Sequence, residues 1–589
     1  MTDQITVEVL RSKFDAVVAE MRATLINTAC SATVSEANQC CNGLFTEAGL
    51  LVTIDNPLHL SSMAETAAAV LDYFQYDLGG EDILLTNDPY GGGSRLQEFT
   101  AIAPVSFAEE IVLYVGVRAH TEDIGGDLRG NYNPRATDIW AEGVRCPPVK
   151  IYRDGKLLKD TLNTIALNSR NPKAFRLDLE AMFSSVRVGQ ARMAELLHDY
   201  GAKVVLDALD WSVDYAEARF SSMLNSWGDI SATGKCRLMH DCQAREDLNI
   251  QVRLEIANGR LLLDFSATDA QSTGFVNTTP AQALSYALLP VFASLGTDIP
   301  KNAGSLRCID LVAPEGSLVN ARLPAPTGWS ASHIGTELAL AVTDALAGLD
   351  PDKVANVAGN PMLIFMIRRG IRNGFTVEQL GLTNFARFTQ GGCSGAVGRD
   401  GWGMPGISAA TPLPSIEMFE AEVDGEIRKL EYVTDSAGAG QWRGGPGTEA
   451  CIELPDADAD EFYLTACVIP RQQAAGFAGG AAGTDNAVRV RSDDEAINVE
   501  HTYVDQRLGQ RPELTISMGG GAGWGNPLAR MPEQVLADVL DGYVSIAAAE
   551  AHYGVVVDPV NLQIDIARTA ELKKNRNVNS YRAEERDHD

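Results

Sequence analysis

The sequence has 589 residues, of which 45% are hydrophobic and 21% charged, a composition typical of folded globular proteins rather than disordered or fibrous ones. At about 100–200 residues per domain, this length predicts three or four folding units, or two large ones. Lys and Arg number 48 against 78 Asp and Glu, and the resulting net charge of −30 disfavours nucleic acid and bare membrane as partners, because both carry negative charge.

The sequence gives few indications of membrane targeting, secretion or disulfide bonds. No run approaches the ~20 apolar residues of a membrane span, and the polar start MTDQITVEVLRSKFD lacks the basic and apolar regions of a signal peptide. The ten cysteines are sparse for this length and form no C-x-x-C. We therefore expect free thiols and a cytoplasmic location.

Helices and strands are predicted in blocks along the N-terminal part. Apolar residues recur at spacings of three and four from Val7 to Leu25, which predicts a helix of about 20 residues. From Cys40 to about 150, short apolar runs alternate with Gly and Pro, as in strands joined by long loops. Two helices are expected over 174–199 and 202–224.

A second block begins near Thr233. Val252, Leu254 and Ile256 alternate with polar residues, and Asn258-Gly259 predicts the two-residue turn of a hairpin. Helices are expected over 280–295 and 332–348, strands with dense glycine between about 360 and 525, and short helices from Val535 and over 545–553. The last 20 residues are charged and predict a loose or partner-dependent tail.

These blocks lack regular βαβ alternation and predict an α+β fold. We expect a large multi-layer protein of mixed strands and helices with a short helical C-terminal segment. The predicted domains are an N-terminal α+β region (1–228), a strand-rich α+β region (229–530), and C-terminal helices with a charged tail (531–589).

The densest polar chemistry lies between residues 86 and 148. Glycine lets backbone amides approach a ligand, and His, Asp and Glu can bind a metal or move a proton. The alternative is a set of turns, since Asx and Gly residues cluster in turns anyway. The candidate side chains are Asn87, Asp88, Arg95, Glu98, His120, Glu122, Asp123 and Asp127.

Other motifs are weaker. GDISATGKC (228–236) has the wrong spacing for a phosphate loop, and GGGAGWG (519–525) lacks a βαβ context. Cys236, His240 and Cys242 in CRLMHDC could share a strand face, but zinc would need a fourth ligand, so a buried strand is favoured. Cys393 and Ser394 have no recognisable base beside them.

Several segments, in this order and spacing, resemble the hydantoinase B family, which includes B subunits of N-methylhydantoinases, the matching half of 5-oxoprolinases and one subunit of ATP-dependent ketone carboxylases. The resemblance is carried by HLSSMAETAAAVL (59–71), TNDPYGGGSRLQEFT (86–100), RAHTEDIGG (118–126), EGVRCPPVKIYRDGKL (142–157), APEGSLVNARLPAP (313–326), GAGQWRGGPG (438–447), GGGAGWGNPLAR (519–530) and DGYVSIAAAEAHYGVVVD (541–558).

The resemblance implies a division of labour within a hetero-oligomer. An A-type subunit with an ATPase fold binds ATP and Mg and phosphorylates the substrate or bicarbonate, and small accessory subunits complete the complex. The B-type subunit receives the activated species, with bicarbonate as co-substrate in the carboxylases.

The sequence departs from the metal-site pattern of the hydrolytic members. That pattern is an Asp before a Ser-Cys-Ala-hydrophobic-Phe run, then Gly-Gly-Thr-His-x-x-Asp, then Ala-His-His-x-Asp. Gln39 stands at the first position, Arg95 and Glu98 in the second segment, and Thr121 replaces a histidine beside His120 and Asp123 in the third. A guanidinium cannot coordinate a cation, but it can hold an anion such as carboxyphosphate.

The resemblance therefore implies first a ketone carboxylase subunit, most like that of acetophenone carboxylase, with His120, Asp123, Arg95 and Glu98 in one catalytic cavity and no tightly bound metal. His120 is the candidate for proton transfer. The first alternative is a hydantoinase or lactamase B subunit, with Glu98, His120 and Asp123 binding a metal. The second is a non-catalytic scaffold.

Overall fold

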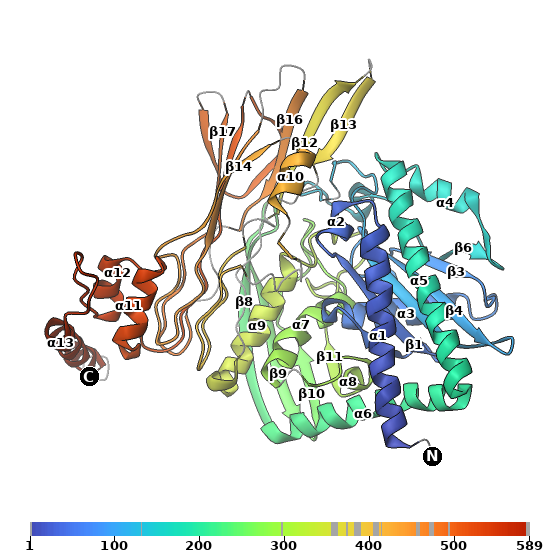
Figure 1. The fold of residues 1–589 in the computed structure, drawn as a ribbon, viewed down its shortest axis with the longest axis horizontal. Coiled ribbons are helices and arrows are strands. Elements are labelled where there is room, and N and C mark those ends of the chain that lie inside the picture. Colours follow the sequence, from blue (N-terminus) through green and yellow to red (C-terminus); the bar gives the residue numbers. More distant parts are fainter. Residues whose placement is uncertain are drawn as a thin grey trace.

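The computed structural model describes residues 3–130, 132–295, 298–354, 363–372, 375–381, 390–404, 412–413, 415–423, 425–454, 460–469, 476–492, 495–509 and 511–584. Within these residues the strands form sheets of seven, four, four and five strands, and helices cover the first two (Figure 1). The predicted α+β class is confirmed.

The seven-stranded sheet carries most of the candidate residues. Its strand order is β2-β1-β5-β4-β3-β6-β7, and every neighbouring pair is antiparallel. The strands are β1 (Cys40–Thr46), β2 (Leu51–Ile54), β3 (Ile83–Thr86), β4 (Glu98–Phe107), β5 (Glu110–His120), β6 (Val149–Arg153) and β7 (Lys156–Leu157).

Long helices lie against both faces of this sheet. Helix α1 (Gln4–Thr28) buries the predicted stripe from Val7 to Leu25 and packs along α5 (Pro172–Tyr200), which lies on β4 and β5. Helix α3 (Leu60–Tyr73) contacts the other face through Arg118 of β5. The short helices α2 (Ala32–Ser35) and α4 (Lys159–Ala166) flank them.

The second sheet has the order β11-β10-β9-β8. The predicted hairpin is confirmed, because β9 and β10 are joined at Asn258 and Gly259, whose φ angles of 53° and 69° suit a tight hairpin turn. The elements are α6 (Ala202–Trp227), β8 (Ile230–His240), β9 (Glu246–Ala257), β10 (Arg260–Asp264), α7 (Pro280–Leu295), α8 (Ala303–Arg307), β11 (Ile309–Val312) and α9 (Ile334–Leu349). One hydrophobic core extends across both sheets from Val7 to Val354 and also takes in Cys467 and Ile469.

The strand-rich part projects from this body (Figure 1). Its sheets have the orders β13-β12-β16-β19 and β14-β15-β20-β17-β18 and enclose a second core. The elements are β12 (Leu363–Arg372), β13 (Phe375–Gly381), α10 (Ile416–Val423), β14 (Glu426–Tyr432), β15 (Thr448–Glu453), β16 (Asp460–Cys467), β17 (Ala487–Ser492), β18 (Glu495–Val499), β19 (Thr502–Arg507) and β20 (Glu513–Ser517).

The glycine-rich segment at 519–525 is a packing element rather than a nucleotide loop. The Gly438 amide donates to the Gly521 carbonyl at 2.8 Å, and a Cβ on Gly521 would lie 1.9 Å from the Cys393 carbonyl oxygen. Only glycine allows backbones to approach this closely. The dense glycine between residues 390 and 525 therefore serves to pack extended segments side by side.

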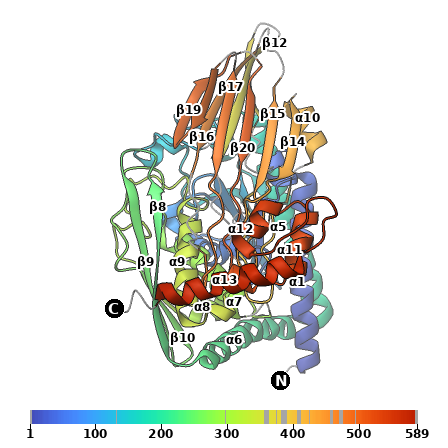
Figure 2. The same ribbon diagram turned by 90° about the vertical axis from the view of Figure 1, so that its left-hand side faces the viewer.

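The C-terminal segment is helical, as predicted, and its last helix continues into the charged residues as far as Glu584. Helices α11 (Pro532–Leu540), α12 (Ile546–Tyr553) and α13 (Ile566–Glu584) follow one another, and Figure 1 shows them at the far left, apart from the main body, on the side that faces the viewer in Figure 2. The Lys573 ammonium donates to the carbonyls of Leu528 and Arg530 at 2.9 and 3.0 Å. This side chain therefore attaches α13 to the segment that precedes α11. No helix of the described residues is long and apolar enough to cross a bilayer.

Candidate functional site

Two long loops at one end of the seven-stranded sheet are joined at their bases by hydrogen bonds and an ion pair. The Asn87 amide donates to the carbonyls of Leu96 and Val144 at 2.7 and 2.9 Å and accepts from the Cys146 amide at 2.7 Å. The Arg145 guanidinium donates two hydrogen bonds, of 2.8 and 2.7 Å, to the Asp88 carboxylate. The Asn-Asp turn after β3 thus fixes the loop before β4 to the loop before β6.

Gly92 brings the first of these loops against α3. Its φ is +88°, and a Cβ there would lie 2.7 Å from the carbonyl carbon of Glu65. Both the left-handed conformation and the lack of space require glycine. The close approach holds Gly92 against Glu65 and Thr66 of α3 and so fixes the start of the segment that carries Ser94 and Arg95.

Glu98 and His120 are direct cross-strand partners at the ends of β4 and β5. The next pair on the same face is Thr100 and Arg118, because side chains alternate along a strand. Arg118 is buried and donates to the hydroxyls of Thr100, Ser62 and Thr66 at 2.7–2.8 Å. The sheet register therefore places His120 and Arg118 on the same face as the Glu98 carboxylate.

Arg95 and Glu98 form a buried ion pair in the middle of this site. The guanidinium Nε and Nη2 lie 3.0 and 2.9 Å from Glu98 Oε1, and Nη1 donates to the Tyr132 hydroxyl at 2.9 Å. Ser94 Oγ donates to the other Glu98 oxygen. Burial alone would raise the pKa of Glu98, but Arg95, His59 and Arg118 outweigh it and hold that pKa well below its usual range. The carboxylate is therefore ionised at neutral pH.

His59 joins the cluster from the start of α3. Its Nδ1 lies 3.6 Å from Glu98 Oε2. Burial lowers the pKa of His59 to about 4, so the ring is neutral at pH 7 and the contact is polar rather than ionic. Tyr132 stacks on His120 with ring centroids 6.0 Å apart. Sequence reasoning missed His59 and Tyr132 as site residues, because nothing local distinguishes them from loop residues.

The hydrogen-bond partners of Asp123 differ from those of the Arg95–Glu98 ion pair. Its two oxygens accept from the backbone amides of Gly125 and Arg170, at 3.1 and 2.8 Å, and from the Arg170 guanidinium at 3.1 Å. Arg170 also donates to the Gly125 and Gly126 carbonyls. Asp123 therefore holds the 121–128 loop against the segment before α5, whereas Arg95, Glu98 and His120 are brought together.

The remaining positions of the metal pattern have structural contacts. The Gln39 carbonyl accepts from the His120 amide at 3.0 Å, and Thr121 donates from its amide and hydroxyl to the Gln97 carbonyl at 2.8 and 3.0 Å. Asp127 is exposed. Gln39 and Thr121 therefore contact the backbone at the ends of β5 and β4.

These residues do not fit a divalent metal. Glu98 is held by a guanidinium, whose charge repels a cation, and the two Asp123 oxygens are already hydrogen-bonded. In the described part of the chain, no group of three His, Cys, Asp or Glu side chains is arranged to hold a metal ion. The alternative set Glu98, His120 and Asp123 is not a ligand set in this arrangement.

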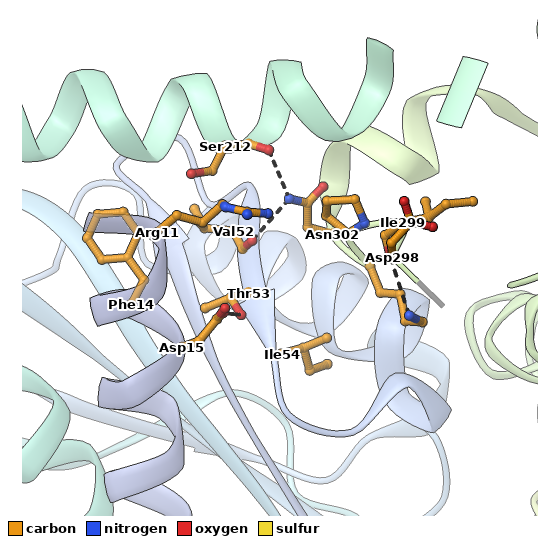
Figure 3. Close-up of a pocket in the computed structure, with 12 residues that line it drawn as sticks. Arg11, Phe14, Asp15, Val52, Thr53, Ile54, Ser212, Asp298, Ile299 and Asn302 are labelled. Atoms are coloured by element: carbon orange, nitrogen blue, oxygen red, sulfur yellow. Dashed lines mark hydrogen bonds between the residues drawn. The ribbon is translucent and has the colours of Figure 1, made fainter. Parts of the chain in front are cut away.

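A separate cavity of about 310 Å³ opens between α1, β2, α6 and the 298–302 segment (Figure 3). The Asn302 amide donates there to the carbonyls of Val52 and Ser212 at 3.0 and 3.2 Å, and the Thr53 hydroxyl donates to Asp15 at 2.6 Å. None of the predicted site residues lines it. Its polar side chains hold elements of the main body together.

Comparison with known proteins places these features in context. The family model described as hydantoinase B/oxoprolinase matches residues 3–527. The caprolactamase subunit beta of Pseudomonas jessenii is 30% identical over 96% of this chain and 98% of its own length. The crystal structure of the ATP-dependent caprolactamase from that organism superposes with a TM-score of 0.88 at 27% identity, covering 97% of this chain and 99% of the other. A nucleotide-free acetone carboxylase structure matches with a TM-score of 0.84 at 16% identity, covering 98% of this chain and 83% of the other, and shares the fold.

Proposed function

Because the chain belongs to the hydantoinase B/oxoprolinase family, we propose that it is the reaction subunit of an ATP-dependent cyclic-amide hydrolase. Its family comprises B-type subunits of ATP-dependent cyclic-amide hydrolases and carboxylases. A lactam substrate is favoured because the full-length relative at 30% identity is a caprolactamase subunit, whereas acetone carboxylase shares only the fold.

The proposal places ATP and Mg on a partner subunit. The matching relative is named subunit beta of an ATP-dependent enzyme, so a second subunit type belongs to that complex. The partner would be an A-type ATPase-fold subunit that phosphorylates the amide oxygen. This chain would then receive the activated amide and open its ring with water.

The observation that carries the proposal is the Arg95–Glu98–His120 cluster. Arg95 keeps Glu98 ionised in a buried site, and Glu98 pairs with His120 across the strands. A fixed carboxylate orients a neighbouring imidazole, and an imidazole can take a proton from water near neutral pH. We assign proton transfer to His120, orientation to Glu98 and Arg95, and loop positioning to Asp123.

Ketone carboxylation is the second candidate, favoured by the cationic Arg95. A buried guanidinium suits a site that handles bicarbonate, carboxyphosphate or an enolate better than one that binds a metal. Nη1 is the donor that faces Tyr132 rather than Glu98, so it is the group that an incoming anion would reach by displacing the tyrosine.

The two functions are separated by isotope and nucleotide assays on the complex co-purified with its A-type partner. ε-Caprolactam, hydantoin and 5-oxoproline are tested for substrate-dependent ADP release and ring opening, and acetophenone and acetone for incorporation of ¹⁴C-bicarbonate. Ring opening without label incorporation supports the hydrolase. Label incorporation without lactam turnover overturns it in favour of the carboxylase.

A scaffold role is tested by His120→Ala in the same complex. Catalysis by His120 predicts at least a hundredfold loss of turnover with the complex intact. His198→Ala on the exposed surface of α5 is the matched control and should leave turnover unchanged. Full activity of His120→Ala would support the scaffold.

A further inference from the structure

Cys242 lies where the second sheet meets the strand-rich part. Strand β8 ends at His240, and the chain then turns through Asp241, whose carboxylate accepts from the amides of Gln243 and Arg245 at 2.9 and 3.0 Å. Cys242 has a φ of +63° in this turn. A left-handed conformation at a non-glycine residue is strained and persists where its surroundings enforce it.

The hydrogen bonds of His240 fix its tautomer. Nε2 lies 2.8 Å from the Val468 carbonyl oxygen, which can only accept, so Nε2 carries the proton. Nδ1 is therefore the basic nitrogen, and it lies 3.4 Å from Cys242 Sγ. This is the arrangement in which an imidazole takes the proton of a thiol and leaves a thiolate.

Two further histidines and a carboxylate surround the Cys242–His240 pair. The rings of His333 and His501 lie 5.4 and 5.2 Å from that of His240, and Glu337 Oε1 is 2.9 Å from His333 Nδ1. Burial alone would raise the pKa of Cys242, but the bonds from Cys467 and His240 outweigh it and place that pKa well below its usual range.

Cys467, the last residue of β16, lies beside Cys242, since the next residue, Val468, accepts the hydrogen bond of His240. Burial raises the pKa of Cys467 well above its usual range, so it stays a thiol beside a thiolate. Cys467 is buried, whereas Cys242 is partly exposed. The two residues thus differ in the way that an attacking and a resolving cysteine differ.

We propose that Cys242 is a peroxide-reactive cysteine and Cys467 its resolving partner, with a hydroperoxide as the oxidant. The Cys242 thiolate attacks one peroxide oxygen, the O–O bond breaks, and the leaving oxygen takes a proton to depart as water or an alcohol. The Cys467 sulfur then attacks the resulting sulfenic acid, loses its proton and releases water. Two thiols are oxidised to one disulfide while one peroxide is reduced.

The disulfide would join the end of β8 to the end of β16. It would thereby fasten the second sheet of the main body to the strand-rich part covalently. This modification is independent of the lactam or ketone chemistry proposed above, because it involves neither the Arg95–Glu98 pair nor His120.

The test uses the full chain in its complex, treated with hydrogen peroxide and analysed by non-reducing peptide mass spectrometry. We expect a Cys242–Cys467 linked peptide in the wild type, and in Cys467→Ser a sulfenic acid at residue 242 that dimedone traps. Cys30, which is exposed, and Cys451, which is partly exposed, are internal controls. Oxidation of Cys30 or Cys451 while Cys242 stays reduced would overturn the proposal.

Alkylation kinetics provide a second measurement that needs no oxidant. A cysteine of ordinary pKa is only about 3% thiolate at pH 7, so Cys242 should react with iodoacetamide at least about tenfold faster than Cys30. His240→Asn should slow Cys242 to the rate of Cys30, with thermal melting used to verify that the variant folds. An equal rate for Cys242 and Cys30 in the wild type would contradict the thiolate assignment.

Discussion

Arg95 and Glu98 are joined by two short contacts to a single carboxylate oxygen, at 3.0 and 2.9 Å, while each residue is only 6% exposed. An ion pair this deep costs desolvation on both sides, and removing one partner leaves the other charge buried and uncompensated. The pair is therefore a sensitive probe of the candidate site.

Glu98→Gln should lower the free energy of unfolding by about 3–5 kcal/mol, because it strands the Arg95 guanidinium. The exposed Arg260–Asp310 pair is the matched control, and Asp310→Asn should cost less than about 1 kcal/mol. Urea unfolding of the purified chain measures both. The double variant Arg95→Met/Glu98→Leu should regain much of the stability but not the activity of the complex. Equal costs at the two sites would contradict the structural role of the pair.

The buried carboxyl group of Glu142 should make the free energy of unfolding depend on pH. Burial raises its pKa to about 8, against the two backbone amides of Thr327 and Gly328 that donate to it at 3.0 and 2.7 Å. Between about pH 5 and 8 the folded state keeps this proton while the unfolded state loses it, so stability falls as pH rises. The slope should approach 1.4 kcal/mol per pH unit relative to Glu142→Gln. If the free energy of unfolding varied with pH in parallel for the wild type and Glu142→Gln, Glu142 would be ionised in the folded state.

Gly92→Ala separates close packing from backbone strain. Gly92 and Gly398 have φ angles of +88° and +82°, but a Cβ meets the Glu65 backbone at 2.7 Å only at Gly92. Gly398→Ala should cost about 1 kcal/mol from the left-handed conformation alone, and Gly92→Ala clearly more. Activity should fall only in Gly92→Ala, since that change moves the Ser94–Arg95 segment off α3. Similar losses in melting temperature would argue against the steric contact.

Asp123 should act through Arg170 rather than on the substrate. Asp123→Asn and Arg170→Met should each lower turnover, and the double variant should be no worse than the more damaged single one, with a coupling energy of about 1–3 kcal/mol. The readouts are kcat and stability measured on the same four proteins. Additive losses would instead give Asp123 a direct role beside His120.

Local sequence patterns predicted the parts of the fold that depend on neighbouring residues. The 3.6-residue periodicity from Val7 to Leu25 corresponds to the buried face of α1, and Asn258-Gly259 forms the expected turn because few other dipeptides tolerate two positive φ angles. The attachment of the charged C-terminal helix lies outside such patterns, because the acceptors that hold Lys573 lie more than 40 residues earlier in the chain.

The candidate site also divides into features predicted from the sequence and features that depend on contacts between distant segments. The sequence, through its family resemblance, predicted one cavity containing Arg95, Glu98, His120 and Asp123, but it did not predict the ion pair between Arg95 and Glu98. Only the tertiary structure decided that His59 and Tyr132 complete the cluster and that Asp123 is held by Arg170. Such contacts depend on strand register and loop packing between distant segments, and burial then sets the charge of each group. Neither register nor burial is encoded in any local window of residues.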